Sequence, residues 1–400
     1  MFSLSKAKEF ILKNTSVLST EEKDFQEALG LILAQDIVAN TDWPPFSRST
    51  MDGFAVRSSD FRNSKSKRPV ALKMIGESRA GHPFLATVAA GEAVRVSTGA
   101  VLPKGVDSVV MKECAKIVGE KVFVFERVFK NDNVRLKRQD ARKGDVLIRK
   151  GAQVTPGIIA LLANLGQRKV KVFKMSRVGI ITTGNELVGL KSNLKLGQIR
   201  SANEYGLAAQ IKQLGAKPFM LGNAKDDLVS TMAKIRQGFA FDVLLISGGV
   251  SVGDHDFVRR ALKKLKAKEI FWKVAVKPGK PLVFAKKGTC HIFGLPGNTA
   301  ASMVSFLTFV RPCLLKMSGI QDAGPKTAEA ILGHDVYDKE RRAKIMRGIV
   351  FERKGERFVR LSANQISENV ISMAKANCLF IVQPGVSFIK KGSKVKVEYT

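Results

Sequence analysis

The stretch Leu245-Ile-Ser-Gly-Gly-Val-Ser-Val-Gly-Asp-His-Asp-Phe257 decides the fold of this 400-residue chain. It predicts a buried strand, at Val243 to Ile246, that runs through a glycine-rich loop into a helix. The glycines allow the backbone to turn tightly and to approach a ligand closely. Two carboxylates, Asp254 and Asp256, follow where a simple phosphate-binding loop would have none. A loop that suits an anion and also carries acids indicates a metal ion bridging the two.

Strand and helix patterns alternate through the region around this stretch. Strands are expected at Val178 to Thr182, Lys217 to Leu221 and Ile292 to Leu295, and helices at Glu204 to Leu214, Asp227 to Gln237 and Thr299 to Lys316. Repeated units of this size predict a doubly wound, mostly parallel sheet, in which ligands bind beyond the carboxyl ends of the strands. We therefore expect three loops to line one crevice: Thr183-Gly-Asn-Glu186, Ser247-Gly-Gly249 and Pro296-Gly-Asn298.

The flanking regions are expected to be mostly β-structured. Helices are predicted at residues 2–13, at Gln26 to Ala34 and at Pro156 to Leu165. Strand candidates before residue 140 are Val70 to Ile75, Ala93 to Val96, Ser108 to Met111 and Lys121 to Phe125. Those in the C-terminal region are Ala343 to Val350, Arg357 to Leu361, Cys378 to Val382 and Lys394 to Tyr399. The pattern thus predicts a β-rich domain on each side of the α/β region.

The composition narrows the class of protein. The 67 Lys and Arg against 35 Asp and Glu give a net charge of +32, which could attract nucleic acid or a membrane surface. The cations form no single block, and no aromatic side chains interleave with them for base stacking, so we expect neither partner. The N-terminus is charged where a signal peptide is apolar, and the four scattered cysteines fit neither a zinc site nor a disulfide framework. We therefore expect a cytoplasmic protein that acts on an anionic small molecule.

Candidate reactive groups gather at the predicted crevice. They comprise the acids Glu186, Asp226 or Asp227, Asp254 and Asp256, the lysines Lys273, Lys277 and Lys280, and the loop donors Ser247, Gly248, Gly249 and Ser251. Acids and lysines around a glycine loop suit a phosphate or phosphoanhydride held through Mg²⁺. The chain has neither a P-loop lysine signature nor a GxGxxG fingerprint after a strand, and no Ser/His/Asp or Cys/His arrangement indicates covalent catalysis.

Several of these acids also have purely structural explanations. Glu186 could simply lie near the start of a helix, where the helix dipole stabilises an acidic side chain. Asp226 and Asp227 could likewise be acids at a helix N-terminus. Asp52, in a Met-Asp-Gly turn, could be only a turn former. Asp254 and Asp256 follow the glycines inside a loop, where function explains a carboxylate better than structure does.

Six motifs appear in the order of a known family and cover nearly the full length. They are Pro44-Pro-Phe-Ser-Arg-Ser-Thr-Met-Asp-Gly-Phe-Ala-Val-Arg57, Ser97-Thr-Gly-Ala100, Thr182-Thr-Gly-Asn-Glu-Leu187, Ser247 to Asp256, Lys277-Pro-Gly-Lys-Pro281 and Gly294-Leu-Pro-Gly-Asn298. On these motifs the chain resembles the molybdopterin molybdenumtransferases, the MoeA and gephyrin E-domain family of molybdenum cofactor biosynthesis. It departs from the family pattern at Thr299, where relatives have a second proline, and around residue 140.

The resemblance implies four domains, a homodimer and a reaction. The domains would be a split N-terminal linker domain (residues 1–43 and 141–175), an inserted β-rich domain (44–140), a molybdopterin-binding α/β domain (176–323) and a C-terminal β-barrel domain (324–400). The implied reaction depends on Mg²⁺, inserts molybdenum from molybdate into adenylylated molybdopterin and releases AMP. An adenylyltransferase and acceptor molybdoenzymes are implied as protein partners.

The motif matches also assign residue roles. Catalytic roles would fall to Asp52, Glu186, Asp227, Asp256, Lys273 and Lys277, with Glu186 and Asp256 as metal ligands. Cofactor binding would fall to Thr98, Asp140, Thr183, Gly184, Ser247, Gly248, Gly249, Ser251, Lys280, Pro296, Gly297, Asn298, Arg347 and Ser367. The choices between Asp226 and Asp227, and between Asp140 and Asp145, stay open. The resemblance also leaves open whether the site is shared across the dimer.

Two other functions fit parts of the pattern. The related molybdopterin adenylyltransferase shares the α/β domain, but it normally stands alone and has a TGGTG-type loop, whereas the loop in this chain reads Ser247-Gly-Gly-Val-Ser-Val-Gly253. A scaffold or binding protein could use the same fold without turnover, as gephyrin's E domain does when it binds receptor peptides. The acids and lysines at the predicted crevice favour the enzyme.

Overall fold

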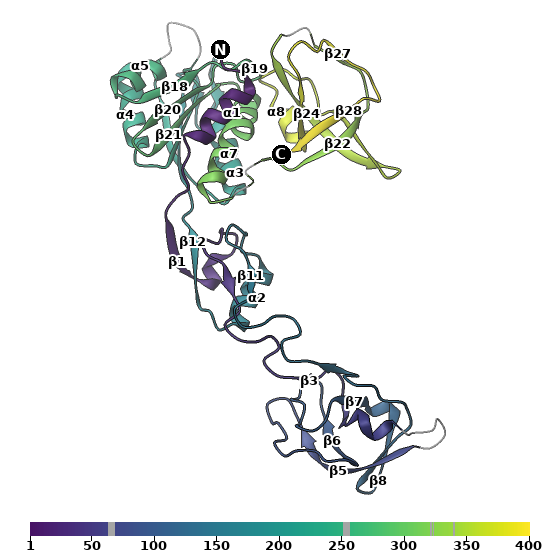
Figure 1. Cartoon of the computed structure of the whole chain (residues 1–400). Coiled ribbons are helices and arrows are strands. Elements are labelled where there is room, and N and C mark those ends of the chain that lie inside the picture. The colour runs from purple at the N-terminus through teal and green to yellow at the C-terminus, as the bar shows by residue number, and fades with distance from the viewer. Residues whose placement is uncertain (63–68, 251–256, 321, 323, 339–340) are drawn as a thin grey trace. The chain divides into compact units, whose positions relative to one another are not determined.

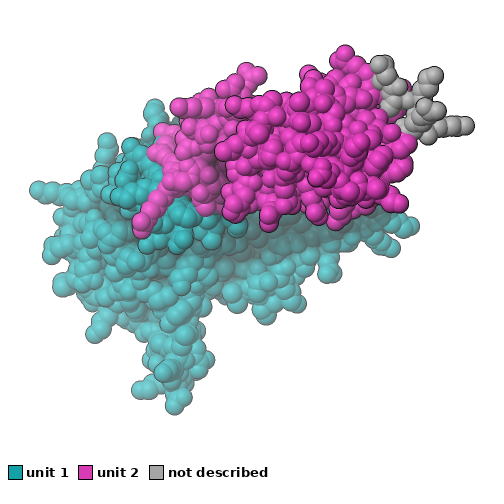
Figure 2. Space-filling view, turned by 90° about the horizontal axis from the view of Figure 1, so that it is seen from below, with its two compact units in different colours: residues 1–34, 151–159, 169–400 teal, residues 35–150, 160–168 magenta. Residues whose placement is uncertain are grey.

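The computed structural model describes the chain from residue 1 to residue 400 except for residues 63–68, 251–256, 321, 323 and 339–340. The chain forms two compact units (Figure 2). Unit 1 comprises Met1–Ala34, Gly151–Ile159 and Lys169–Thr400, and unit 2 comprises Gln35–Lys150 and Ala160–Arg168. Each unit is built from segments that are separate in the sequence, so the chain crosses between them more than once.

Unit 1 contains the six-stranded sheet that the alternating pattern predicts. Its order is β16 (Lys217–Ala224), β13 (Arg177–Thr183), β17 (Val243–Ser247), β21 (Cys290–Leu295), β20 (Val283–Lys287) and β18 (Lys268–Trp272). The first four strands are parallel to one another, whereas β20 and β18 add an antiparallel edge. The expected doubly wound, mostly parallel α/β domain is therefore confirmed, and the antiparallel pair is an addition that the sequence pattern did not predict.

Helices cover both faces of this sheet because both faces are apolar. Along β17, Val243 and Leu245 contact one core cluster and Leu244 and Ile246 contact another, as the two-residue period of a strand requires. The first cluster is covered by α1 (Leu4–Lys13), α3 (Asn203–Gln213), α6 (Thr299–Ser305) and α7 (Arg311–Met317), and the second by α4 (Leu228–Gly238) and α5 (Phe257–Lys264). Figure 1 shows α4 and α5 on one side of the sheet and α1, α3 and α7 on the other.

A single helical stretch, Thr299–Met317, is long and apolar enough to cross a membrane among the residues that the structure describes. Its mean hydropathy is 1.3, and 78% of the window is buried inside the protein. A π-helical turn, Phe306–Val310, joins α6 to α7, and all five of its residues are buried. Packing against the central sheet therefore accounts for the apolar character of this stretch.

The predicted helix at Gln26 to Ala34 is wrong. A 3₁₀ turn covers only Phe25–Ala28, and Gly30 then adopts a left-handed backbone with φ of 80°, which ends the turn. The following backbone instead bonds to the segment near residue 153, since the Leu33 N–H donates to the Ala152 carbonyl at 2.9 Å. β1 (Thr20–Asp24) pairs with β12 (Lys169–Phe173) in the same region. Tertiary pairing thus overrides the local helical pattern.

Unit 2 is built around a second six-stranded sheet. Its order is β7 (Ser108–Met111), β4 (Gly53–Val56), β6 (Glu92–Val96), β5 (Val70–Ser78), β9 (Lys121–Val124) and β8 (Ala115–Val118). The four strand candidates of the sequence all lie in this sheet, and β8 was not predicted. Phe54, Leu72 and Val110 lie in its apolar core. The expected β-rich domain is therefore confirmed.

The C-terminal region of unit 1 is a closed five-stranded barrel. Its strands are β24 (Ala343–Arg353), β25 (Glu356–Leu361), β22 (Thr327–Leu332), β28 (Lys394–Tyr399) and β26 (Cys378–Val382), and pairing of β24 with β26 closes the ring. The short strand β19 (Val276–Lys277) also pairs with β24, in register Val276 to Ala343. The predicted barrel is confirmed, although β22 and α8 (Val370–Lys375) were not predicted.

Short elements complete the two units. The remaining helix is α2 (Pro156–Asn164), and the remaining strand pairs are β2 (Ile37–Val38) with β11 (Val146–Ile148), β3 (Arg48–Ser49) with β10 (Val134–Arg135), β14 (Leu187–Val188) with β15 (Ile199–Arg200), and β23 (Val336–Tyr337) with β27 (Phe388–Ile389). The helix α2 ends at Asn164, one residue before the predicted end at Leu165, and Gly166 follows with a left-handed φ of 67°, which suits the residue after a helix C-terminus.

Candidate active site

A cavity of about 640 Å³ opens at the carboxyl ends of the parallel strands of unit 1. It is lined by residues of the loops after β13, β16, β17 and β21 and of the loop after β19. The sequence-predicted residues on its wall are Thr183, Gly184, Glu186, Gly248, Gly249, Lys277, Lys280, Pro296, Gly297, Asn298 and Ser367. Residues from loops far apart in the sequence therefore meet at one site, as the topology of an open α/β sheet favours.

The glycine loop after β17 approaches the loop after β13 too closely for side chains. Gly248 and Gly249 have φ of 96° and 65°, in the left-handed region that favours glycine. A Cβ added at Gly248 would lie 2.7 Å from Thr183 Oγ1 and 2.9 Å from the Thr183 carbonyl oxygen. The wall of the cavity is thus made of backbone at this point.

Ser247 lies beneath this loop rather than on the cavity wall. Its hydroxyl is buried, accepts a hydrogen bond from Asn203 Nδ2 at 2.8 Å and donates to the Pro296 carbonyl at 3.2 Å. The Asn203 amide also donates to the Gly297 carbonyl. Ser247 therefore ties the glycine loop to the Pro296 loop, which is a structural role.

Asp226 and Asp227, between which the sequence did not decide, have different surroundings in the structure. Asp226 lies on the cavity wall, and its carboxylate accepts the Asn185 N–H at 3.0 Å while the Asn185 side chain accepts the Asp226 N–H at 3.2 Å. Asp227 is the N-cap of α4 and accepts the Ser230 N–H at 2.7 Å. Asp226 thus joins Glu186 on the wall, whereas Asp227 satisfies a helix terminus.

Three cationic residues line the same cavity as these two carboxylates. Lys277, at the end of β19, and Lys280 come from the Lys-Pro-Gly-Lys motif, and Arg342 comes from the segment just before β24. Gly279 between the lysines has φ of 105°, so the loop turns where a side chain would be strained. Arg342 was missed because no motif surrounds it, and only the pairing of β19 with β24 brings it here.

Lys273 is placed beside the indole of Trp272 instead of on the cavity wall. Its ammonium lies 3.8 Å from the centre of the Trp272 ring, and its backbone is left-handed with φ of 67°. The Arg259 guanidinium lies 3.6 Å from the same ring and forms two hydrogen bonds with Glu269, at 2.9 and 3.0 Å. Cation–π contacts of this kind hold both cations near the indole.

Thr183 lines the cavity and has a buried hydroxyl without a hydrogen-bond partner among the residues described. Because an unsatisfied buried hydroxyl is costly, a ligand oxygen at this wall would satisfy it.

Arg347 is a second buried group with spare donors. Its side chain is completely buried, and Nη2 donates to the Ile366 carbonyl at 3.1 Å, next to Ser367 on the cavity wall. Nε and Nη1 have no partner within the described part of the chain. Burial lowers the pKa of this guanidinium to about 10.

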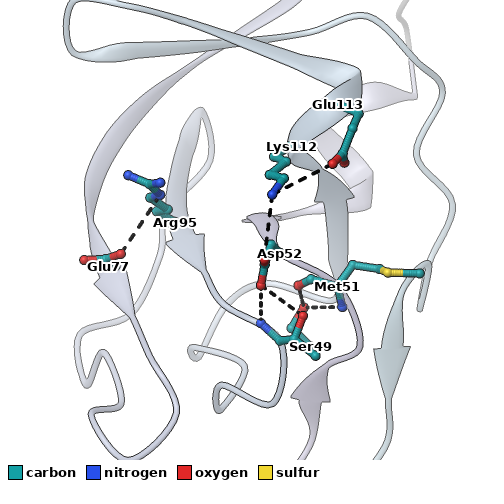
Figure 3. A network of polar contacts seen from close by, with 8 residues as sticks. Ser49, Met51, Asp52, Glu77, Arg95, Lys112 and Glu113 are labelled. Atoms are coloured by element: carbon teal, nitrogen blue, oxygen red, sulfur yellow. Dashed lines mark hydrogen bonds and ion pairs between the residues drawn. The ribbon is translucent and has the colours of Figure 1, made fainter.

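Unit 2 holds three of the sequence-predicted site residues (Figure 3 draws the surroundings of Asp52). Asp52 Oδ1 accepts hydrogen bonds from the Thr98 backbone N–H at 2.8 Å and the Thr98 hydroxyl at 2.9 Å. These two donors, with Lys112 and Arg95 nearby, hold the pKa of Asp52 below its ordinary value. Asp140 pairs with Arg135, whereas Asp145 accepts the Arg142 N–H at 2.8 Å.

The predicted residues Ser251 and Asp256, with Asp254, lie outside the described residues. Among the residues that are described, no group of three or more His, Cys, Asp or Glu is close enough to hold a metal ion. Of the two predicted magnesium ligands, only Glu186 belongs to the described residues, and it lines the cavity. Asp226 lines the same cavity. Carboxylate oxygens are the ligands that Mg²⁺ prefers, so these two side chains fit that ion.

Comparison with known proteins agrees with this architecture. Three family models match in chain order: the MoeA N-terminal region (domain I and II) at residues 2–166, the probable molybdopterin binding domain at 179–316, and the MoeA C-terminal region (domain IV) at 329–399. The chain belongs to the MoeA family. The boundary between the first two matches falls within the region where β12 leads into β13.

Relatives of similar length support the membership. The chain is 37% identical to the molybdopterin molybdenumtransferase of a Nostoc species, over 96% of this chain and 90% of that protein. It is 33% identical to the enzyme of the same name from Haemophilus influenzae, over 100% of this chain and 98% of that one. A MoeA structure from Pyrococcus horikoshii, at 31% identity, superimposes over 100% of this chain and 99% of that one with a TM-score of 0.86.

Proposed function

We propose that this MoeA-family chain is an enzyme that inserts molybdenum from molybdate into adenylylated molybdopterin and releases AMP. The observation that carries the proposal is the cavity at the strand ends, which is lined by two carboxylates, three cations and the glycine backbone of the loop after β17. The names of the full-length relatives support molybdenum transfer to molybdopterin. The adenylylated substrate and AMP release are what the resemblance implies, and carboxylates and cations in one cavity are compatible with cleavage of a phosphoanhydride.

The residues that line the cavity would have two roles, metal binding and anion binding. Glu186, with Asp226 beside it and Asp256 by motif match, would hold Mg²⁺, and the ion would neutralise charge on the phosphoanhydride when bound. Lys277, Lys280 and Arg342 would bind the phosphate and molybdate oxygens, and the backbone near Gly248 would admit the substrate closely.

Lys273 would reach the ligand from its position on Trp272, in keeping with the catalytic role that the motif match assigns. We also propose that the protein acts as a cytoplasmic homodimer, with Asp52 and Thr98 contributing to catalysis and substrate binding. Asp140, Arg347 and Ser367 keep their proposed roles as cofactor-binding residues. An adenylyltransferase would supply the substrate, and molybdoenzymes would accept the product.

The decisive test is release of AMP from adenylylated molybdopterin by the purified chain in the presence of Mg²⁺. We expect AMP to appear only when molybdate is added, and release that is equal with and without molybdate would overturn the proposal. Glu186→Gln should lower the rate by about 100-fold, since it removes a charge that acts in the transition state.

A matched pair of variants tests the assignment of the neighbouring aspartates. Asp226→Asn removes a carboxylate from the cavity wall and should lower AMP release by about tenfold or more. Asp227→Asn makes the same chemical change, but asparagine caps a helix as well as aspartate does, so activity and thermal stability should both be retained. The reverse ranking would assign the catalytic role to Asp227.

A further inference from the structure

Residues 273–280 carry three lysines of the proposed site, and we call them the lysine segment. Phe2, more than two hundred positions earlier in the chain, forms a parallel β-bridge with Val274 of this segment. The Phe2 N–H donates to the Lys273 carbonyl at 3.1 Å, and the Phe2 carbonyl accepts the Ala275 N–H at 2.8 Å. Figure 1 shows the N-terminal end of the chain beside β19, which belongs to the same segment. Phe2 therefore pairs with the segment in the way that a neighbouring strand would.

The backbone of Lys273 needs such support. Its φ of 67° lies in the left-handed region, which a residue with a side chain rarely adopts. The Lys273 N–H donates to the Leu282 carbonyl at 2.9 Å, and the Lys273 carbonyl accepts the Phe2 N–H. An unfavourable backbone conformation persists where the surrounding contacts enforce it, and such residues cluster at functional sites. Phe2 thus supplies one of the hydrogen bonds that fix Lys273 in this conformation.

The other end of the lysine segment is held without Phe2. The Val274 N–H donates to the Lys280 carbonyl at 3.0 Å, which closes the loop on itself. The Ala275 carbonyl accepts the Ala343 N–H at 3.2 Å, and β19 then pairs with β24 of the barrel. Loss of Phe2 should therefore release Lys273 more than the rest of the segment.

The ring of Phe2 keeps its main chain in place. Its centroid lies 5.1 Å from that of Phe271 and 5.4 Å from that of Phe10, and the ring packs against the core cluster that covers one face of the central sheet. The helix α1, which begins two residues later, buries Ala7 and Ile11 in the same cluster. A variant of the Phe2 side chain can therefore loosen the main-chain pairing while both hydrogen-bonding groups remain.

We propose that Phe2 is a positioning residue, which holds Lys273 in its left-handed conformation beside Trp272 for the reaction in the cavity of unit 1. The inference rests on the proposed function, since Lys273 has a catalytic role only in that reaction. Phe2 lies outside the described lining of the cavity, so it acts through Lys273 and not on the substrate.

The kinetics of molybdate-dependent AMP release test this role. Phe2→Ala should lower kcat by about tenfold and change KM for adenylylated molybdopterin by less than about twofold, because catalysis is lost and not binding. Phe2→Leu keeps an apolar side chain in the core and should restore kcat to within about threefold of the parent. The matched control is Leu18→Ala, which removes a partly buried side chain from the same cluster, at a position whose N–H bonds to Met317, and it should leave kcat unchanged.

A double-mutant cycle shows whether Phe2 acts through Lys273. Lys273→Ala alone should lower kcat, and Phe2→Ala added to it should lower kcat no further. A further loss of about tenfold in the double variant would overturn the positioning role, and so would an unchanged kcat in Phe2→Ala alone. Thermal unfolding of Phe2→Ala and Leu18→Ala checks that both variants are folded and similarly destabilised.

Hydrogen exchange of the Ala275 amide provides a readout that needs no substrate. Phe2→Ala should speed this exchange at least tenfold, because the amide donates to the Phe2 carbonyl, whereas Leu18→Ala should change it less than about twofold. Equal exchange in the parent and Phe2→Ala would show that Phe2 does not hold the lysine segment. Absence of AMP release by the parent chain would instead overturn the proposed function, and the amide exchange would still decide whether Phe2 fixes the segment.

Discussion

The cavity of unit 1 and a hollow of about 460 Å³ beside Asp52 in unit 2 are built from different parts of the chain. The cavity is formed at strand ends, where the loops of Gly184, Gly248 and Gly297 bring main chain to the wall. The hollow is formed by long, exposed side chains such as Arg95 and Lys112 on the strands and turns of a β-sheet. The wall of the cavity thus depends on the space left by missing side chains, whereas the wall of the hollow is formed by charged side chains. A single added methyl group should therefore harm the first, and single polar changes should alter the second only slightly.

The largest expected effect comes from Gly248→Ala in the cavity. The added Cβ would meet Thr183 Oγ1 at 2.7 Å and would occupy a left-handed backbone, so the loop must shift. We expect AMP release to fall by about 100-fold or more, because displacement of a site by about 1 Å has effects of this size. Turnover assays with adenylylated molybdopterin and molybdate measure the loss.

The matched control for this change is Gly215→Ala. Gly215 also has a left-handed backbone, with φ of 74°, but an added Cβ would have nothing within 4 Å. It should cost about 1–2 kcal/mol of unfolding free energy and leave turnover nearly unchanged. Equal activity loss in both variants would show that backbone strain, and not the space at the cavity wall, limits the first site.

An intermediate effect is expected for Arg347→Met, because the Arg347 guanidinium bonds to the Ile366 carbonyl next to Ser367 of the cavity wall. Burial without full hydrogen bonding disfavours the charged guanidinium, so its replacement should leave the melting temperature unchanged or raise it. If Nε and Nη1 serve a ligand, affinity for molybdate should fall by about tenfold. A large drop in stability with unchanged molybdate affinity would make Arg347 a purely structural residue.

The smallest effect is expected for Thr98→Val beside the hollow. The change removes the hydroxyl donor to Asp52 but keeps the Thr98 backbone N–H, so the pKa of Asp52 should rise and stay below its ordinary value. A carboxyl whose folded pKa is depressed adds stability above its unfolded pKa and loses it as the pH falls through the folded pKa. The variant should thus be slightly less stable than the parent near neutral pH, and the difference should disappear as the pH falls through the folded pKa of Asp52.

Carbon-detected NMR titration of the Asp52 carboxyl measures this change directly. Thr98→Ser keeps the hydroxyl donor and provides the control, which should titrate like the parent. An unchanged pKa in the valine variant would leave Lys112, Arg95 and the Thr98 amide as the source of the shift.

Much of the cavity could be predicted from the sequence because its position follows from topology. Buried strands at Val178 to Thr182 and Val243 to Ile246 indicated a parallel sheet, and the glycine loops mark where such strands end. The barrel strands and the β-rich domain also followed from short apolar runs between turn residues. These features depend on local patterns that one sequence displays.

Other features depend on pairings that no local pattern displays. Arg342 reaches the cavity because β24 pairs with β19, and the register of that pair is a long-range property. The helix expected at Gln26 to Ala34 failed because its backbone bonds to residues more than one hundred positions away. The cations of the hollow were missed for the same reason, since they come from separate strands with no shared motif.

The pairing of β19 with β24 has a consequence for the modularity of the chain. Val276–Lys277 precedes the loop that carries Lys280, yet its hydrogen-bonding partner belongs to the barrel. A fragment that stops at residue 323 would leave this strand with an open edge, and the two lysines without the neighbour that orders their loop. Exchange of the barrel between relatives would therefore alter the anion-binding wall of the other domain, so gene fusion or truncation near this boundary is constrained by a strand of two residues.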